Sequence, residues 1–382
     1  MREGKPITKI SLAKPFLNEE VKEAVIHALE NERLVLGESV YKFEEELARY
    51  CGAKYAVAVS SGTNALQLSL IALGLSRGDK VITTPFSFIA TANCIIHAGG
   101  EPVFADIERS TFNIDPKRIR ERLDTDVKAI LPVHLYGYPA EMDEINEMAR
   151  EKNLKVVEDA CQAHGATYKG KRAGSLGDAG CFSFYASKNM TVCGDGGAVV
   201  TNDGELAKLV AKLRDCGRSS KYVHDVIGYT SRLNTMNAAI GRVQLKYLDQ
   251  WNDARRRIAR EYNRLLSDVE GLELPPFETQ AVKPAYHLYV VRTKRRDELK
   301  NWLEENGIEC GIHYPMPIHL QPIYRKLYGY REGQYPESEE VSRTCLSIPM
   351  HPFLMDEEVK YVCDKIIEFF SRKAMQKGQL AN

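Results

Sequence analysis

The sequence predicts an α/β fold in which helices cover both faces of a mostly parallel, seven-stranded sheet. Seven short apolar runs alternate with longer helical patterns between Tyr55 and Thr201. The runs are apolar on both faces, as in strands that helices cover on both sides, and alternation at this spacing favours parallel order. With 382 residues, 44% of them hydrophobic, the chain is long enough for one large core and one smaller core.

The predicted strands are Tyr55–Val59, Lys80–Thr84, Pro102–Asp106, Ala129–Val133, Leu154–Asp159, Cys181–Phe184 and Gly197–Thr201. Two helices are expected before them. Asn18 followed by two glutamates is typical of a helix start, and an apolar stripe from Val21 to Leu29 follows it. Val40, Phe43 and Leu47 indicate the second helix.

The character of the chain changes after about Leu245. Residues 244–266 form one long charged helical pattern, followed by a predicted strand at 286–292, a helix near 296–306 and a final helix from Asp356. We therefore predict a large domain over residues 1–250 and a smaller C-terminal α/β domain over residues 251–382. The N-terminal segment, residues 1–20, is expected to pack on the smaller domain.

The charge balance argues against several classes of partner. Lys and Arg number 52, as do Asp and Glu, so the net charge is zero and no broad basic field exists to bind nucleic acid or an anionic membrane surface. The N-terminus has no apolar signal region and no run reaches eighteen apolar residues, which predicts a soluble, cytoplasmic protein. Nine scattered cysteines without a Cys-x-x-Cys motif indicate reduced thiols, and no metal site is predicted.

Lys188 and Asp159 indicate the chemistry most directly. Lys188 stands in Ser-Phe-Tyr-Ala-Ser-Lys-Asn, where a short apolar strand runs into a polar turn, and Asp159 ends an earlier strand. Pyridoxal phosphate chemistry needs both groups: a lysine amine condenses with the cofactor aldehyde, and a carboxylate keeps the pyridine nitrogen protonated. A lone buried lysine more often forms a structural ion pair. A lysine, an aspartate and a phosphate-binding loop in one chain indicate the cofactor.

The stretch Ser60-Ser-Gly-Thr-Asn64 is a candidate for that loop. It lies between the first predicted strand and a helical pattern over 65–73. Helix N-terminal amides and the helix dipole favour an anion, Gly62 allows close approach of the backbone, and Ser61 and Thr63 offer hydroxyls. The same residues are good helix caps, so taken alone this stretch leaves both interpretations open.

Three further residues are candidates for the site. Gln162 follows Asp159 and can bond the phenolic oxygen of the cofactor. Phe88 follows a predicted strand end, where an aromatic ring stacks on a flat ligand or fills the core. His164 is expected to have a structural or supporting role rather than one in proton transfer.

Taken together, these stretches resemble the sugar aminotransferase branch of the fold-type I pyridoxal phosphate enzymes, the DegT/DnrJ/StrS group. The resemblance runs from about Ile10 to Phe370. Its marks are SSGTNAL at 60–66, PFSFIATANCI at 85–95, EDACQAHGATYKGKRAGSLGDAGCFSFYASKN at 158–189, GDGGAVVTND at 194–203, GYTSRLNTMNAAIG at 228–241, HYPMPIHLQP at 313–322 and LSIPMHPFLMDEEV at 346–359.

The resemblance implies roles for the matching residues. Lys188 would be the Schiff-base lysine and Asp159 the partner of the pyridine nitrogen. The remaining cofactor contacts would be Gln162 on the phenolic oxygen, Phe88 on the ring, and Ser61, Gly62, Thr63 and Ser183 on the phosphate. It also implies a homodimer in which each site borrows residues from the neighbouring subunit.

The sequence departs from the family pattern at several places. Thr230 stands where the family has an asparagine that reaches the phosphate of the neighbouring subunit, although Arg232 remains. Asn237 replaces a glutamine, Ala186 replaces a proline, and Met190-Thr191 replaces Leu-Gly beside the lysine. Substrate contacts are expected from Arg218 and Tyr222 of the neighbouring subunit and from His313 and Tyr314.

The expected function is transfer of an amino group from L-glutamate to a nucleotide-linked keto-sugar. A cyclitol ketone as acceptor with glutamine as donor is an alternative within the same chemistry. A sugar dehydratase of this fold has a histidine in place of the lysine, which Lys188 argues against. A non-catalytic regulatory protein on the same scaffold is the alternative from another class, and retention of both Lys188 and Asp159 argues against it.

Overall fold

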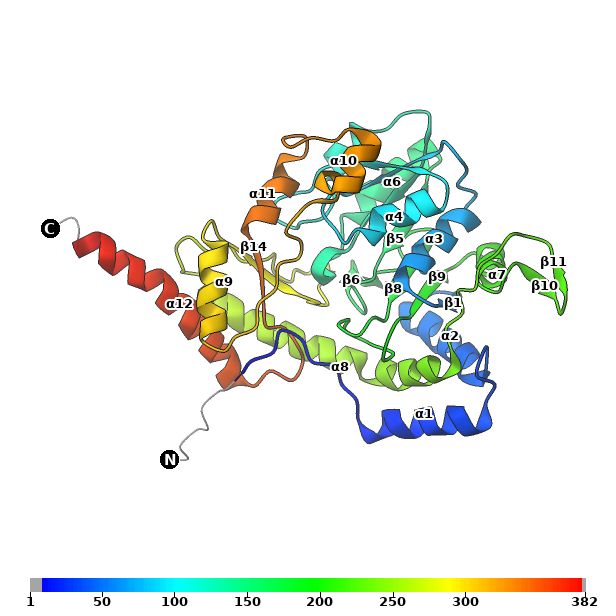
Figure 1. The fold of residues 1–382 in the computed structure, drawn as a ribbon, viewed down its shortest axis with the longest axis horizontal. Helices are drawn as coiled ribbons and strands as arrows, with labels where there is room; N and C mark the ends of the chain where they lie inside the picture. The colour runs from blue at the N-terminus through cyan, green and yellow to red at the C-terminus, as the bar shows by residue number, and fades with distance from the viewer. Residues whose placement is uncertain (1–8, 380–382) are drawn as a thin grey trace.

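The structure is a computed structural model that describes residues 9–379, with side chains as far as Arg372. Figure 1 shows a central sheet with helices packed on both faces, and one long helix, α8, that runs beneath the sheet toward the C-terminal part of the chain. Residues 1–8, which belong to the N-terminal segment predicted to pack on the smaller domain, lie outside the described residues.

The central sheet has seven strands in the order β1-β9-β8-β5-β4-β2-β3. Strands β8, β5, β4, β2 and β3 are parallel, and β9 runs antiparallel to both β1 and β8. The predicted mostly parallel sheet is therefore confirmed. The strands are β1 (Tyr55–Val59), β2 (Lys80–Thr83), β3 (Glu101–Phe104), β4 (Val127–Leu131), β5 (Lys155–Asp159), β8 (Ala179–Ser183) and β9 (Gly197–Thr201).

The antiparallel strand follows from its connection. Strands β8 and β9 are joined by the loop over residues 184–196 that carries Lys188, and this loop contains no helix. Parallel neighbours need a crossover connection, usually a helix, whereas antiparallel neighbours do not. The direction of β9 thus leaves the Lys188 loop at one edge of the sheet.

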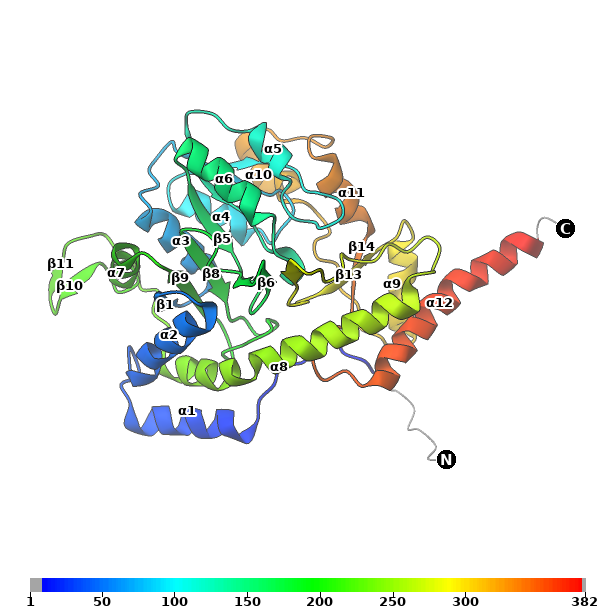
Figure 2. The same ribbon diagram turned by 180° about the vertical axis from the view of Figure 1, so that it is seen from behind.

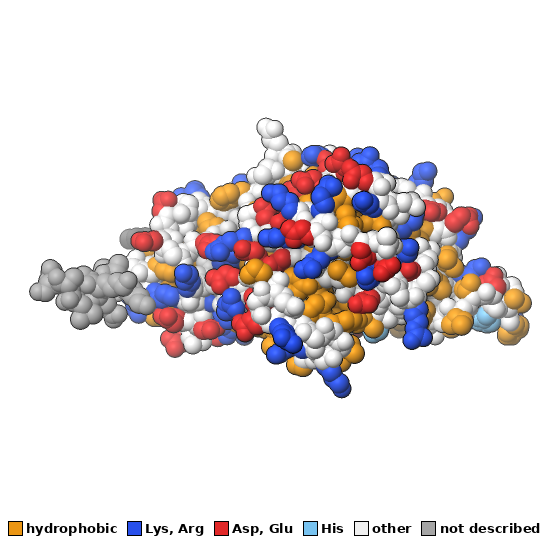
Figure 3. Space-filling model, turned by 90° about the horizontal axis from the view of Figure 1, so that it is seen from above, with side chains coloured by type: hydrophobic (Ala, Val, Ile, Leu, Met, Phe, Trp, Pro, Cys, Tyr) orange, Lys and Arg blue, Asp and Glu red, His pale blue; other side chains and the backbone are white. Residues whose placement is uncertain are grey.

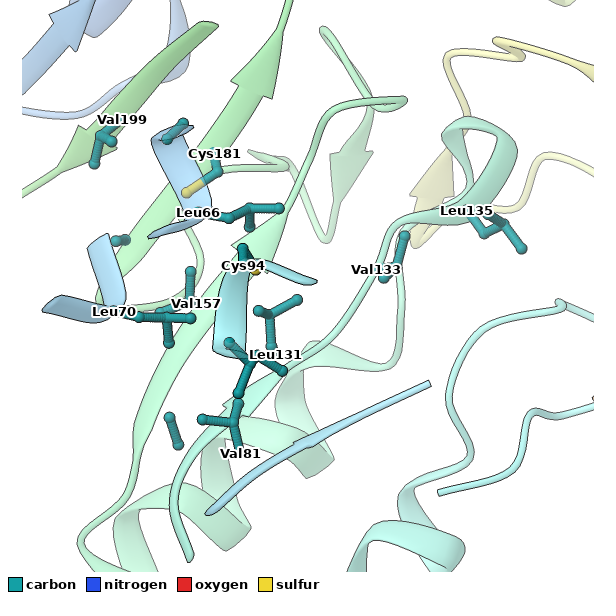
Figure 4. Close-up of a cluster of buried hydrophobic side chains, with 14 of the residues drawn as sticks. Leu66, Leu70, Val81, Cys94, Leu131, Val133, Leu135, Val157, Cys181 and Val199 are labelled. Carbon is teal, nitrogen blue, oxygen red and sulfur yellow. The ribbon is translucent and has the colours of Figure 1, made fainter. Parts of the chain in front are cut away.

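Helices α3, α4 and α7 cover one face of the sheet, and α2, α5, α6 and part of α8 cover the other. Alternate residues of each strand point to opposite faces, so Val157 packs under α3 and α4 while Val156 packs against α6. Figure 4 shows the first of these cores, with Leu70 of α3 beside Val157 of β5. These helices are α2 (Glu38–Cys51), α3 (Gly62–Ala72), α4 (Ala90–His97), α5 (Pro116–Arg120), α6 (Met142–Lys152), α7 (Gly204–Leu213) and α8 (Thr235–Leu266).

A separate apolar cluster lies in the C-terminal part of the chain, where the end of α8 packs with the pair β13–β14 and with α9 and α12. Ile10 belongs to this cluster and pairs with Ile308. Its elements and neighbours are β12 (Val282–Lys283), β13 (Tyr289–Arg292), β14 (Cys345–Ile348), α9 (Arg296–Glu305), α10 (Pro322–Tyr328), α11 (Pro336–Thr344) and α12 (Asp356–Gln379). The division at residue 250 stays a prediction, and that residue falls inside α8.

Several predicted boundaries shift for identifiable reasons. Strand β4 ends at Leu131 rather than Val133, because Pro132 has no N–H to donate to a sheet ladder. The strand predicted from residue 286 begins at Tyr289, because Tyr286 has a left-handed backbone with φ of 42° and is held by a turn near Gly137. Helix α8 begins at Thr235 rather than at Gln244, since Asn234 caps it through the N–H of Asn237.

The remaining elements are short or peripheral to the sheet. They are helix α1 (Glu19–Asn31), the short strands β6 (Thr167–Tyr168) and β7 (Lys171–Arg172), the hairpin of β10 (Arg218–Ser220) and β11 (Val223–His224), and two 3-10 turns over Leu135–Gly137 and Ile318–Leu320. Figures 1 and 2 both show the hairpin projecting from the body beside α7. Figure 3 shows positive and negative side chains interspersed on one face of the molecule. Among residues 9–379, no helix combines the length and the apolar character that crossing a membrane requires.

Candidate active site

The candidate site lies at the carboxyl edge of the sheet, where strands β1, β2, β5 and β8 all end. Such an edge collects the side chains and helix N-termini that follow parallel strands. Asp159 and Ser183 are the last residues of β5 and β8, and Gly62 opens helix α3 shortly after β1. The sheet topology therefore brings Gly62, Asp159 and Ser183, which are far apart in the sequence, to the same edge.

Asp159 is held firmly within this edge. Its side chain is only 6% exposed, and its two carboxylate oxygens accept bonds from the Thr91 hydroxyl at 2.8 Å and from the Cys161 N–H at 3.2 Å. Its own N–H donates to the Pro132 carbonyl at 2.9 Å. Buried carboxylates need such partners, and these contacts fix the direction in which the carboxylate faces.

Lys188 lies in the loop between β8 and β9, and its N–H donates to the Tyr185 carbonyl at 2.9 Å. Burial lowers the pKa of the Lys188 amine, while the nearby Cys161 and Asp159 groups oppose that shift. The structure thus places the amine of Lys188 within charge-interaction range of the carboxylate of Asp159. A lowered pKa increases the fraction of neutral amine, which is the nucleophilic form.

The N-terminus of α3 forms the third side of the site. Ser61 caps the helix by accepting the N–H of Asn64 at 3.1 Å, so the capping interpretation of this stretch is correct. The anion interpretation stays a prediction. A Cβ added at Gly62 would lie 2.7 Å from both Cys161 Sγ and Ser183 Cβ, so glycine is required for the start of α3 to pack directly against these two residues.

Gln162 and Tyr314 are joined across the site. The amide oxygen of Gln162 accepts the N–H of Tyr136 at 2.9 Å, and its amide nitrogen donates to the Tyr314 hydroxyl at 3.3 Å. The Tyr136 hydroxyl in turn donates to the carbonyl of His313. Burial raises the pKa of the Tyr314 hydroxyl, and the charge of Asp159 adds to this shift. The two residues predicted from the motif at 313–322 therefore lie beside the cofactor residues.

Phe88 and Phe86 flank this group with different environments. Phe86 is fully buried and fills the core, whereas Phe88 is 56% exposed. The ring of Tyr314 lies 6.1 Å from Phe88 and 6.4 Å from Phe86, measured between centroids. An exposed aromatic ring at this edge has a free face, which is the arrangement that stacking on a flat ligand requires.

Three histidines surround Lys188, and all are held neutral. Burial and then the charge of Lys188 lower the pKa of His164 to about 3 and that of His313 to about 4, and they lower the pKa of His287 well below its ordinary value. His164 packs against Phe182 and Phe184, and neither of its ring nitrogens has a hydrogen-bond partner among the described residues. Its packing favours the structural role that the sequence suggested.

The structure does not bring three of the predicted contacts to this site within one chain. Arg218 and Tyr222 lie on the projecting hairpin, where Tyr222 is 82% exposed. Thr230 is exposed, pairs with Asp215, and has its hydroxyl 3.4 Å from Cys216 Sγ. Adjacent residues in extended chain point in opposite directions, and it is Ser231 that faces the α3 loop, through Asn64.

Sequence reasoning missed several residues that shape the site. Thr91 on α4 bonds Asp159, and Tyr136 has a left-handed backbone with φ of 56° that aims its N–H at Gln162. Neither position has a signal in a single sequence, because each acts through a contact between segments distant in the chain. His287 and Asn189, which bond each other at 3.2 Å beside Lys188, were missed for the same reason.

The chain was compared with known proteins. The sequence model of the DegT/DnrJ/EryC1/StrS aminotransferase family matches residues 15–367. A curated relative from Geobacillus stearothermophilus, named a pleiotropic regulatory protein, is 43% identical over 366 residues, covering 96% of this chain and 98% of the relative. A second relative, from Streptomyces venezuelae, is named dTDP-3-amino-3,4,6-trideoxy-alpha-D-glucose transaminase and is 40% identical over 367 residues, covering 96% of each chain.

One solved structure adds a cofactor to the comparison. NtdA from Bacillus subtilis, solved with bound cofactor PMP, is 31% identical and superposes with a TM-score of 0.90. The match covers 97% of this chain and 87% of NtdA. Agreement of this extent confirms the fold that the resemblance implied.

The lowered pKa of Lys188 predicts early reaction with amine reagents. In the cofactor-free protein, we expect the labelling rate of Lys188 to reach half its maximum below pH 10.5, the ordinary pKa of a lysine amine. Lys208 on α7 provides the control, because its bond to Glu205 raises the pKa of its amine above 10.5. Peptide mass spectrometry across a pH series measures both midpoints, and a Lys188 midpoint at or above that of Lys208 contradicts the prediction.

Gly62→Ala should displace the start of α3 from Cys161 and Ser183. The new Cβ would lie 2.7 Å from Cys161 Sγ and Ser183 Cβ, and such overpacking typically costs about 1–3 kcal/mol. We expect weaker binding of pyridoxal phosphate, measured by absorbance titration of the cofactor-free protein. Gly204→Ala is the matched control, since Gly204 also opens a helix and its Cβ would meet only the end of the Tyr55 side chain, at 3.2 Å. Equal cofactor affinity in the two variants would contradict a role of the α3 N-terminus in binding the cofactor phosphate.

Proposed function

The chain belongs to the DegT/DnrJ/EryC1/StrS aminotransferase family, and we propose that within this family it transfers the amino group of L-glutamate to a keto-sugar linked to a nucleotide. It is a pyridoxal phosphate-dependent transaminase, as its relatives and structural neighbours indicate. The observation that carries the proposal is the convergence of Lys188, Asp159 and the N-terminus of α3 at one edge of the sheet.

The residues present at this edge fit the cofactor. Gly62 lets the N-terminus of α3 pack against Ser183, and the amides and the dipole at this helix start favour a phosphate. Ser61, Thr63 and Ser183 would supply hydroxyls. Asp159 would hold the pyridine nitrogen, since a carboxylate already fixed by Thr91 and Cys161 loses little freedom in making a further charge-assisted bond.

Pyridoxal phosphate, when bound, supplies an aldehyde that takes up the amino group and a ring that withdraws electrons from the reacting carbon. The protein supplies the rest. Lys188 Nζ would hold the cofactor and would carry the proton away from the donor's α carbon. Positioned acid–base catalysis of this kind contributes about 10²–10⁴-fold to the rate.

Gln162 and Phe88 would orient the ring. The amide oxygen of Gln162 accepts the N–H of Tyr136, and its amide nitrogen faces Tyr314. The amide nitrogen would therefore donate to the phenolic oxygen of the cofactor. Phe88 offers a free aromatic face on the same side as Tyr314. These contacts would fix the plane of the ring before any proton moves.

The acceptor is proposed to be a nucleotide-linked sugar because a relative of 40% identity is named a transaminase of a dTDP-linked sugar. His313 and Tyr314, which lie beside Gln162, would contact the sugar. A relative of 43% identity is named a regulatory protein, which keeps a non-catalytic function as the rival. A lysine of lowered pKa within charge-interaction range of a fixed carboxylate favours catalysis, because strongly perturbed groups of this kind gather at functional sites.

We further propose a homodimer in which each site receives the hairpin of the other subunit. The segment over 216–230 carries Tyr222, Val223 and Ile227 at 82%, 57% and 92% exposure, which is unusual for large apolar residues of a monomer. The hairpin projects from the body and so cannot close over its own Lys188 without moving. Arg218, Tyr222 and Thr230 would then contact the partner's substrate and phosphate.

The function is tested with purified protein, pyridoxal phosphate, L-glutamate and a panel of dTDP- and UDP-linked keto-sugars, with amino-sugar and 2-oxoglutarate formation measured by mass spectrometry. We expect one sugar nucleotide to be aminated with parallel double-reciprocal plots, because donor and acceptor react in turn. Lys188→Ala should lower turnover by at least about 10²-fold, and Lys208→Ala should not change it. Amination of cyclitol ketones alone would support the alternative acceptor, and no turnover with any ketone would support the regulatory rival.

The shared site is tested by mixing subunits. Lys188→Ala protein and Tyr222→Ala/Arg218→Ala protein are each expected to have little activity alone. After mixing and reassociation, half of the dimers combine the two variants and hold one intact site each, so activity should return to about a quarter of the unsubstituted level. If the hairpin instead serves its own chain, the mixed dimers contain no intact site and activity stays absent.

A further inference from the structure

Behind Lys188 lies a buried pair of amides, Asn189 and Asn252, that the mechanism above does not use. Asn189 is 4% exposed and makes three hydrogen bonds. Its amide nitrogen donates to Asn252 Oδ1 at 3.0 Å and to the Ala285 carbonyl at 2.8 Å, and its amide oxygen faces His287 Nδ1 at 3.2 Å. Because an amide oxygen only accepts, Nδ1 of His287 must be the donor.

Asn252 extends this contact to the other side of the site. It lies on α8, is 1% exposed, and donates from Nδ2 to the His164 carbonyl at 2.7 Å. His164 stands two residues beyond Gln162 in the turn that follows β5. A single side chain on α8 therefore bonds both the residue next to Lys188 and the turn that carries Gln162.

A second series of hydrogen bonds also connects Gln162 with Asn189, so that the two series together form a closed circle. Gln162 accepts the N–H of Tyr136 at 2.9 Å, and the carbonyl of Tyr136 accepts the N–H of His287 at 2.8 Å. His287 then returns to Asn189. Gly137 adds a contact from the next residue, because its carbonyl accepts the N–H of Ala285 at 2.9 Å.

The residues of this circle are closely packed against neighbouring backbone. A Cβ at Gly165 would lie 2.6 Å from Asn252 Nδ2, and a Cβ at Gly137 would lie 3.0 Å from the backbone atoms Gln162 O and His287 N. The amide of Asn252 is thus pressed against the turn after His164, and the Gly137 turn is pressed between Gln162 and His287. Fully bonded polar networks in such surroundings define a single arrangement of the groups attached to them.

We propose that Asn252 is a positioning residue for the transamination reaction: through Asn189 and the carbonyl of His164, it fixes the amine of Lys188 against the side chain of Gln162. The inference rests on the assignment of Lys188 and Gln162 in the proposed function. Asn252 does not contact the reacting atoms in this arrangement. It acts by setting the distance between the group that moves the proton and the group that orients the ring.

The test compares Asn252→Ala, Asn189→Ala and the double variant with Asn146→Ala, all as holoenzymes. Asn146 is the matched control, because it makes one amide–carbonyl bond of 3.0 Å to Leu176 from α6, which contributes no residue to the circle. Misplacement of a catalytic group by about 1 Å costs about 10²-fold in rate, so we expect kcat to fall by about 10- to 100-fold in both single variants. KM for the donor should change by less than about threefold, as for a group that acts after binding.

Two readouts separate positioning from loss of stability. The pH at which the absorbance of the bound cofactor changes should shift in Asn252→Ala and Asn189→Ala and stay unchanged in Asn146→Ala. The double variant should be slowed by less than the product of the two single effects, because the bond between Asn189 and Asn252 is lost in each single variant. Asn252→Gln, which keeps the amide on a longer stem, is measured in parallel, so a failure of Asn252→Ala to fold leaves the inference open to contradiction.

The outcomes distinguish this inference from the function on which it rests. Borohydride reduction followed by peptide mapping of the unsubstituted holoenzyme shows whether Lys188 carries the cofactor. If it does not, the assignment of Lys188 fails and the inference fails with it. If Lys188 is labelled but kcat and the absorbance midpoint of the Asn252 and Asn189 variants match those of Asn146→Ala, the inference alone is overturned.

Discussion

The structure depends on keeping one amine out of water and next to one carboxylate. A lysine amine in a buried position is costly when charged, and its lowered pKa reports that cost. Asp159 offsets part of it, and the three histidines nearest Lys188 remain neutral and so add no further positive charge. The aspartate is in turn fixed by Thr91 and by the end of β5. The surrounding fold can be understood as the frame that holds these two groups at one sheet edge.

That frame follows from topology rather than from local sequence signals. Parallel strands have their carboxyl ends on the same side of the sheet. Residues that follow four different strands therefore lie close together, and no separate long-range contact is needed to bring each of them there. The loop with Lys188 leaves the pattern, because it joins β8 to an antiparallel neighbour. This exception keeps the loop at the edge instead of sending the chain across the sheet through a helix. The position of the Lys188 loop directly after Ser183, the last residue of β8, is a result of that one reversal.

The sequence alone was sufficient for the sheet and for the chemical groups, but not for what holds them. Hydrophobic patterning located all seven strands, with several ends displaced by one or two residues, as where Pro132 ends the β4 ladder. Lys188, Asp159 and Gly62 could be predicted because each lies in a recognisable sequence pattern at the end of a predicted strand. Thr91, Tyr136, Asn189 and Asn252 were not, since each works by a bond to a segment far away in the sequence. The hairpin over 218–224 was assigned a role only through a family resemblance, and its distance from its own site was visible only in three dimensions.

The length of helix α8 determines how the two cores can move relative to each other. It is continuous from Thr235 to Leu266, begins under the sheet, and ends in the apolar cluster that contains β13, β14 and α12. A continuous helix transmits tilt along its axis and has no hinge in its interior. Relative movement of the two cores would therefore change the non-helical chain that joins them, such as the chain after Leu266 and before β13, which includes Tyr286 with its left-handed backbone. Motion of the C-terminal core would thus reach the Lys188 loop as a rotation of α8. Asn252, which accepts a hydrogen bond from Asn189, is one residue of α8 that contacts this loop.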